Sequence, residues 1–198
     1  DQGVDAIIQN SDNMTVPGLH NDILNARDAG IPVFLLDAES ITHGAYSITI
    51  DHSKWAKTSL GWLLEKSGGS GEIAYFNLDP LNRYTDVIND LLLQYPGIKV
   101  VEFRDGKYDS SKIKPETSDF VFTYPDLKAI WSSYDNNQAM WGLEGNGIPY
   151  DQWPVMICEA NLDGLLLWER AKQEYPDFDC FAVANPPGIA YDAVYAAY

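Results

Sequence analysis

The chain has 198 residues, of which 45% are hydrophobic, so it can bury a core as one large domain or two small ones. This composition excludes a disordered chain. Thirteen lysines and arginines stand against 29 aspartates and glutamates, which gives a formal net charge of −16, and the basic residues are scattered. Such a surface repels a phosphate backbone, so nucleic acid is not expected as a partner.

Eight short segments rich in β-branched or aromatic residues are predicted to be strands. They are Val4 to Asn10, Ile31 to Asp37, Tyr46 to Asp51, Gly71 to Asn77, Ile98 to Arg104, Leu127 to Ser133, Trp153 to Glu159 and Phe178 to Ala184. Helical patterns fill most of the intervals between them. The predicted helices are Leu19 to Ala29, Trp55 to Lys66, Tyr84 to Tyr95, Glu116 to Thr123 and Leu162 to Tyr175. The fourth is predicted to begin only after Pro115, which interrupts the pattern.

Successive strands are mostly about 25 to 29 residues apart, the size of a βαβ unit, so parallel sheets with right-handed crossovers are expected. The interval between Asp37 and Tyr46 is an exception, because residues 38–45 are too few for a parallel crossover with its helix. The chain is therefore expected to leave one sheet for another there. The same interval disfavours a closed eight-stranded barrel and favours two doubly wound domains.

One predicted strand ends in a polar and aromatic tip. The strand from Leu127 to Ser133 is followed by Tyr134, Asp135 and Asn136, and a helix begins at once. Side chains at such a junction lie at the carboxyl edge of a sheet, where open α/β folds bind ligands. Either Asp135 or Asn136 only caps the helix, or this tip contacts a small polar molecule.

Cysteine and histidine usage limits other chemistry. Cys158 and Cys180 each lie in an apolar, strand-like run, which favours two buried thiols over a disulfide. The three histidines, His20, His43 and His52, lie in different segments without ligand spacing, so neither a metal nor a cofactor is predicted. No apolar run approaches the ~20 residues of a membrane span, so membrane insertion by this segment is not expected.

An ordered set of short motifs runs along nearly the whole chain. It comprises Val4-Asp5-Ala6-Ile7-Ile8, Ala29-Gly30-Ile31-Pro32-Val33 with Asp37, Ile50-Asp51, Gly71-Glu72-Ile73-Ala74, Arg83, Tyr95-Pro96-Gly97-Ile98, Tyr124-Pro125-Asp126-Leu127-Lys128-Ala129-Ile130 and Tyr134-Asp135. In order and spacing this set resembles the type I periplasmic sugar-binding proteins of the ribose-binding kind, whose core is shared by lactose-repressor-type regulators.

The resemblance implies an α/β fold of two doubly wound parallel-sheet lobes joined by crossover segments. Residues 1–50 would be part of the first lobe, residues 51–184 the second lobe, and residues 185–198 a return to the first. Relative to the family, two βα units would precede Asp1 and a final strand would follow Tyr198. The first lobe is therefore expected to be incomplete.

The resemblance also implies a ligand site, which begins with three residues. Asp37 occupies the position of an acidic residue that binds sugar hydroxyls, although Ala38 replaces the arginine often found beside it. Arg83 matches a ligand-binding arginine; alternatively, it is a surface arginine paired with Asp79 or Asp86. Tyr108 matches an aromatic residue that stacks on the sugar, with an ordinary loop tyrosine as the alternative. Removing the Arg83 side chain is expected to weaken binding and to change stability little.

Three further positions complete the implied site. Tyr134 replaces a frequent asparagine, so the ligand or its pose should differ from ribose. Glu159 stands where the family usually has aspartate; alternatively, it caps the next helix. Asn185 takes the place of a glutamine or asparagine at a domain crossover.

The resemblance predicts a non-catalytic protein that binds a small neutral sugar or polyol in the interlobe cleft and delivers it to an ABC-type importer permease. It would be periplasmic or extracellular, either free or lipid-anchored through sequence preceding Asp1. One alternative is the effector-binding module of a sugar-responsive regulator. Another is a glycosidase using Asp37, Asp51 and Glu159 as carboxylates, which no nucleophile elbow, phosphate loop or zinc signature accompanies.

Overall fold

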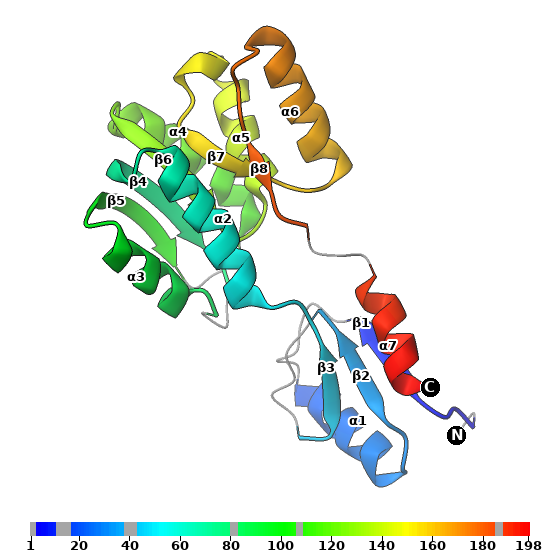
Figure 1. Ribbon diagram of the computed structural model, residues 1–198. Helices are drawn as coiled ribbons and strands as arrows, with labels where there is room; N and C mark the ends of the chain where they lie inside the picture. Colours follow the sequence, from blue (N-terminus) through cyan, green and yellow to red (C-terminus); the bar gives the residue numbers. More distant parts are fainter. Residues whose placement is uncertain (1–2, 11–16, 38–42, 80–82, 106–108, 185–187) are drawn as a thin grey trace. The chain divides into compact units, whose positions relative to one another are not determined.

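A computed structural model describes the chain from residue 3 to residue 198, apart from residues 11–16, 38–42, 80–82, 106–108 and 185–187 (Figure 1). The chain divides into two compact units. Unit 1 consists of Asp1–Asp51 and Asn185–Tyr198, and unit 2 consists of His52–Ala184. Within the described ranges, no helix is both long and apolar enough to cross a membrane.

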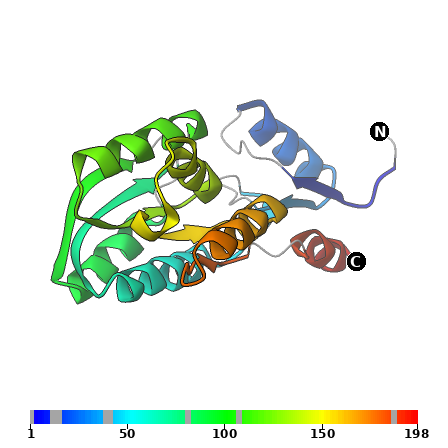
Figure 2. The same cartoon turned by 90° about the horizontal axis from the view of Figure 1, so that it is seen from above.

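Unit 1 contains a three-stranded parallel sheet between two helices. The strands, in the order β1-β2-β3, are Ile7–Asn10, Val33–Leu36 and Ala45–Ile48. Helix α1 (Pro17–Asp28) packs Ile23 against Val33 and Leu35 of β2. Helix α7 (Ile189–Ala197) contacts β2 and β3, and Figures 1 and 2 show it on the other side of the sheet from α1. This helix was not predicted from the sequence.

Unit 2 is a doubly wound domain around a five-stranded parallel sheet in the order β5-β4-β6-β7-β8. The strands are β4 (Ser70–Asn77), β5 (Gly97–Asp105), β6 (Leu127–Ser132), β7 (Val155–Cys158) and β8 (Phe181–Ala182). The helices are α2 (His52–Lys66), α3 (Thr85–Gln94), α4 (Ser110–Thr123), α5 (Asn136–Gly145) and α6 (Leu162–Glu174), with a short 3-10 turn at Tyr150–Gln152.

Alternating side chains divide the core of unit 2 into two layers, one on each face of the sheet. Ile130 of β6 packs with residues of α4, α5 and α6, whereas its neighbours Ala129 and Trp131 pack with residues of α2 and α3. Figure 2 shows α4 and α5 on one side of the sheet and α2 and α3 on the other. A strand covered on both faces is apolar at nearly every position, which is why β6 was recognisable in the sequence.

The predicted fold class, α/β with doubly wound parallel sheets, is confirmed. Both cysteines, Cys158 and Cys180, are buried free thiols, as expected. Strands β4 and β5 are slightly longer than predicted. The other six are shorter, most clearly the last one, where only Phe181–Ala182 form a ladder.

The expected change of sheet between Asp37 and Tyr46 is wrong. β3 lies parallel to β2 in the same sheet, with Val33 opposite Ala45. Each strand has four residues and therefore spans only about 13 Å. Eight residues separate the two strands, and a chain of that length can extend over roughly 26 Å, which is enough to reach the start of a parallel neighbour.

The helix predicted to begin at Glu116 begins six residues earlier, at Ser110. Pro115 lies inside this helix and removes one backbone donor, but it does not end the helix. Ile113 and Phe120 on either side of the proline are both buried. Their packing holds the helix on the sheet through the interruption, because tertiary burial outweighs local propensity.

Helices α4 and α5 pack closely at Gly142, and we predict that this glycine is required for stability. A Cβ atom at Gly142 would lie 2.5 Å from the Lys114 carbonyl oxygen, so Gly142→Ala should lower the free energy of unfolding by about 1–3 kcal/mol. Gly61 of α2 has open space at the same position, so the control Gly61→Ala should raise it by about 0.5–1 kcal/mol. Urea unfolding followed by circular dichroism tests both, and similar effects of the two changes would contradict this packing.

Candidate functional site

The strand order of unit 2 defines a topological switch point between β4 and β6. The chain leaves β4 toward β5 on one side, and the later strands β6, β7 and β8 lie on the other side. The loops that follow β4 and β6 therefore diverge at the carboxyl edge of the sheet, where such folds hold ligands. The candidate site is built from these two loops and from the loop after β7.

Arg83 and Asp79, in the segment after β4, form the central ion pair of this edge. Asp79 is fully buried, and the Arg83 side chain is 15% exposed. The guanidinium binds the carboxylate through two hydrogen bonds, from Nε to Oδ2 at 3.0 Å and from Nη2 to Oδ1 at 3.1 Å. The backbone N–H of Arg83 also donates to Oδ2, at 2.7 Å. A planar guanidinium held in this way has a fixed orientation.

The other donors of Arg83 reach two further segments. Its Nη2 donates to the hydroxyl of Tyr134, which follows β6, at 2.9 Å, and its Nη1 lies 2.6 Å from Nε2 of His52, the first residue of α2. His52 Nδ1 in turn lies 2.9 Å from the hydroxyl of Tyr84. Because a guanidinium can only donate, Nε2 of His52 accepts, and Nδ1 therefore carries the proton and donates to Tyr84. His52 is thus a neutral imidazole of defined tautomer.

Burial and hydrogen bonding set the charge states of this network. Burial alone would lower the pKa of Arg83, but the hydrogen bond and charge of Asp79, together with Tyr134, raise it above the ordinary arginine value. Burial also raises the pKa of Tyr84 above the ordinary tyrosine value, and Tyr134 adds to that increase. Arg83 is therefore a permanent cation and Tyr84 a neutral phenol over the physiological pH range.

A cluster of aromatic rings packs against the hydrogen-bond network of Arg83 and His52. The ring of Tyr84 contacts Trp131 edge to face with centroids 6.1 Å apart, and Tyr134 in the same manner at 6.2 Å. Trp131 is fully buried in β6 and donates its Nε1 to the hydroxyl of Ser59 at 3.0 Å. These packed rings have few alternative positions, so Tyr134 is held in place beside Arg83.

The loop after β7 contacts the start of α5 through carboxylate and amide side chains. Glu159 Oε1 accepts from the backbone N–H of Asn136 at 2.9 Å and from its side-chain amide at 3.0 Å, so Glu159 caps α5 rather than the helix that follows it. Helix α6 is capped by Asn161, whose side chain accepts from Gly164 N. The amide of Asn137 links the two loops by donating to Asn161 at 3.1 Å.

Two aspartates at strand ends adopt a left-handed backbone. Asp135 has φ 51° at the N-cap of α5 without a capping bond from its side chain, and Asp37 has φ 52° after β2 in unit 1. Aspartate is among the few residues that tolerate this region. The Asp37 side chain is exposed.

The structure brings together two of the six residues proposed from the sequence, Arg83 and Tyr134, and places Glu159 in the adjoining loop. Asp37 belongs to unit 1. Tyr108 and Asn185 lie outside the described residues. The expectation of an Arg83 whose removal leaves stability unchanged does not fit this geometry, because its partner Asp79 is fully buried.

Sequence reasoning missed the roles of His52 and Tyr84. His52 was considered only as a metal ligand, and Tyr84 only as part of a helical stripe. Tyr84, like Asp79, had a local signal, since both lie within four residues of Arg83. The contact of His52 with Arg83 joins residues 31 positions apart, so no local pattern could have found it.

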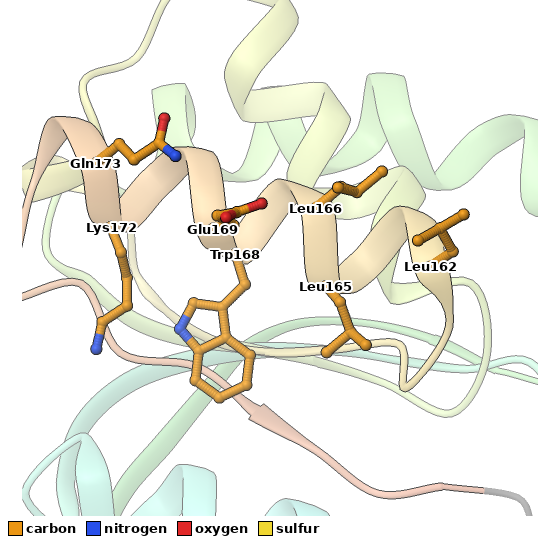
Figure 3. A pocket seen from close by; sticks show the side chains of 7 residues that line it. All are labelled: Leu162, Leu165, Leu166, Trp168, Glu169, Lys172 and Gln173. Carbon is orange, nitrogen blue, oxygen red and sulfur yellow. The ribbon is translucent and has the colours of Figure 1, made fainter.

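A surface hollow elsewhere on unit 2 does not provide an alternative site. It lies along α6 and is lined by Leu162, Leu165, Leu166, Trp168, Glu169, Lys172 and Gln173, as Figure 3 shows. All of these residues belong to one helix, so polar groups from separate elements do not converge there, as they do in binding sites. In the part of the chain that the structure describes, no group of histidine, cysteine and carboxylate side chains could hold a metal ion.

The doubly wound units and the polar carboxyl edge define a ligand-binding class of α/β protein, and comparison with known proteins identifies the family. A family model described as "Periplasmic binding protein domain" matches residues 1–198. The chain belongs to this family, which confirms the resemblance seen in its motifs. Comparison with curated proteins gives no match.

Solved structures with the same fold come from several bacteria. An ABC transporter solute binding protein from Thermobispora bispora DSM 43833 is 24% identical with a TM-score of 0.79, and the match covers 99% of this chain and 60% of that one. One from Agrobacterium vitis, bound with alpha-D-tagatopyranose, is 20% identical with a TM-score of 0.78, covering 99% and 69%. One from Actinobacillus succinogenes 130z, with bound D-allose, is 18% identical with a TM-score of 0.77, covering 98% and 71%. The chain thus spans 60% to 71% of these proteins, and the likeness establishes the fold.

We predict that Arg83 is required for stability. Arg83→Ala leaves the carboxylate of Asp79 buried without its cation, which should lower the free energy of unfolding by about 3 kcal/mol. Arg170 serves as a control, since it pairs with Glu144 and is 51% exposed; Arg170→Ala should cost less than about 1 kcal/mol. Urea unfolding measures both, and equal losses for the two variants would contradict a structural role for the Asp79 pair.

Proposed function

We propose that the chain binds a small neutral sugar or polyol, without turning it over, and that the carboxyl edge of unit 2 supplies one part of the site. The family match over residues 1–198 carries this proposal. Structures of the same fold are described with bound D-allose, alpha-D-tagatopyranose and glycerol. These three ligands are uncharged and rich in hydroxyl groups, and they set the ligand class that we propose.

The charge balance of the edge also favours a neutral ligand. Asp79 neutralises the guanidinium of Arg83 through two hydrogen bonds, and His52 is uncharged. In the described network of Arg83, Asp79 and His52, a sugar phosphate or carboxylate would therefore meet no uncompensated cation, while the chain as a whole carries a formal charge of −16. A hydroxyl group, in contrast, can donate to a carboxylate and accept from a guanidinium or phenol.

Two carboxylates at the carboxyl edge of unit 2, Asp79 and Glu159, are engaged in structural contacts, which supports binding without catalysis. Asp79 accepts from Arg83, and Glu159 holds the first turn of α5 through Asn136. A glycosidase requires a pair of carboxyl groups facing one bond, one of them able to deliver a proton. Under the proposed function, Asp37, Arg83, Tyr134 and Glu159 bind or position the ligand and transfer no proton. Tyr108 and Asn185 remain proposed ligand residues.

The family also guides the proposed cellular role. We infer that the protein acts outside the cytoplasm, in the periplasm or an extracellular compartment, and passes its ligand to an ABC-type importer permease. Solved proteins of the same fold are described as ABC transporter solute binding proteins, which supports this inference. The regulator and glycosidase alternatives have no specific observation in their favour.

We predict that the protein binds a neutral monosaccharide or polyol in titration calorimetry and returns it chemically unchanged. A panel that includes D-allose, tagatose and glycerol is the starting point, chosen from the ligands of the similar structures. Tyr134→Phe removes the hydroxyl that accepts from Arg83 and should weaken binding about fivefold, the value of one hydrogen bond.

The matched control for Tyr134 is Tyr150, which follows α5 and lies away from the carboxyl edge of the sheet. Its hydroxyl donates to Glu144 in the last turn of α5. Tyr150→Phe should leave the affinity unchanged. Enzymatic release of a reducing sugar from a glycoside would refute the binding function, and an equal loss of affinity in both tyrosine variants would remove Tyr134 from the site.

Asp37 provides a separate test in unit 1. Asn tolerates the same left-handed backbone, so Asp37→Asn should leave the thermal midpoint unchanged. Loss of the charge should weaken sugar binding about tenfold, because hydroxyl donors bind a carboxylate more strongly than an amide oxygen. Calorimetry and a thermal melt check the two effects. Unchanged affinity at an unchanged midpoint would exclude Asp37 as a ligand residue.

A further inference from the structure

We propose that His52 is a positioning residue for Arg83, and that protonation of His52 weakens ligand binding at this edge. The proposal rests on the proposed function for its effect on binding, whereas the contact itself is a property of unit 2 alone. His52 is the residue at which the chain enters unit 2, and it is also the first residue of α2.

The contact requires the neutral form of the imidazole. Arg83 Nη1 lies 2.6 Å from His52 Nε2, and the Tyr84 hydroxyl lies 2.9 Å from Nδ1. Only the tautomer with hydrogen on Nδ1 satisfies both contacts, because arginine has no acceptor. A second proton on the ring would turn Nε2 into a donor facing another donor and would place two positive charges side by side.

The surroundings of His52 oppose a positive charge on the ring. The residue is 8% exposed, and it lies at the amino end of α2, where the helix dipole is positive. Among the described residues, the charged and titratable groups near it include Arg83 and Tyr84, which contact it directly, and Asp79 and Tyr134, which bind Arg83. Asp51 and Lys54 belong to its own segment. Both oxygens of Asp79 are engaged by Arg83, so this carboxylate already offsets one cation.

Protonation would act on the ligand site through Arg83. Repulsion from the imidazolium displaces Nη1, and the same rigid guanidinium plane carries Nη2, which donates to the Tyr134 hydroxyl. The Asp79 pair holds the opposite side of the plane. The expected result is a tilted guanidinium and a misplaced Tyr134 in a protein that remains folded. Affinity should therefore fall as the pH decreases through the range in which histidines titrate.

The test is the pH profile of sugar affinity for the wild type and for His52→Gln. Glutamine keeps an oxygen that accepts from Arg83 but does not titrate. Between about pH 8 and pH 5 the wild-type affinity should fall about tenfold, whereas that of His52→Gln should change by less than about twofold. His20→Gln, an exposed histidine on α1, should retain the wild-type profile. Parallel profiles for the wild type and His52→Gln would overturn the proposal.

A measurement without ligand separates this inference from the proposed function. Long-range ¹H–¹⁵N NMR of the unliganded protein should show His52 protonated at Nδ1, and the Arg83 side-chain resonances should shift as His52 titrates. An Nε2–H tautomer would overturn the positioning role. Arg83 chemical shifts that stay constant while His52 titrates would also overturn it. If no sugar binds at any pH while these signatures are present, the proposed function fails and the positioning of Arg83 by His52 stands.

Discussion

The buried pair of Asp79 and Arg83 is the interaction on which the polar edge of unit 2 depends. A carboxylate with no exposed surface requires a cation and full hydrogen bonding, and Arg83 supplies both from four residues further along the chain. This requirement fixes the positions of Asp79 and Arg83 relative to one another. It also fixes the plane of the guanidinium, whose remaining donors reach His52 and Tyr134. One buried charge therefore orients groups from three separate segments.

Adjacent loops at this edge are cross-linked by side chains that cap helices or backbone groups. The hydroxyl of Ser133 after β6 accepts from the backbone N–H of Leu78 after β4 at 2.9 Å. Glu159 after β7 caps α5, which follows β6. Each loop is thus held by a neighbour rather than by its own residues alone. A ligand that binds such an edge loses little free energy to ordering it, which is the physical advantage of a preorganised site.

The sequence predicted the fold of unit 2 well, because strands covered on both faces are mainly apolar, as β6 is at four of its six positions. Two predictions failed because they used local rules alone. The strand β3 pairs with β2, since both strands are short enough for a short connection. Helix α4 continues through Pro115, since Ile113 and Phe120 are buried on either side of it. At the site, Arg83 and Tyr134 were proposed from motifs, but the burial of Asp79 and the contact with His52 arise only when distant segments meet. No spacing rule in the sequence reports such contacts.

The network also implies that, under the proposed function, recognition at this edge depends more on the direction of its hydrogen bonds than on charge. Asp79 offsets Arg83, the tautomer of His52 is neutral, and burial keeps Tyr84 a phenol. What the edge offers is a set of donors and acceptors at fixed angles within an acidic chain. Ion pairing is strong but tolerant of geometry, whereas hydrogen bonds to hydroxyls require alignment and leave a buried group unpaired when it fails. Under the proposed function, such a site would distinguish polyols by the orientation of their hydroxyl groups. The proposed protonation of His52 would then change the direction of the Arg83 donors without changing the fold.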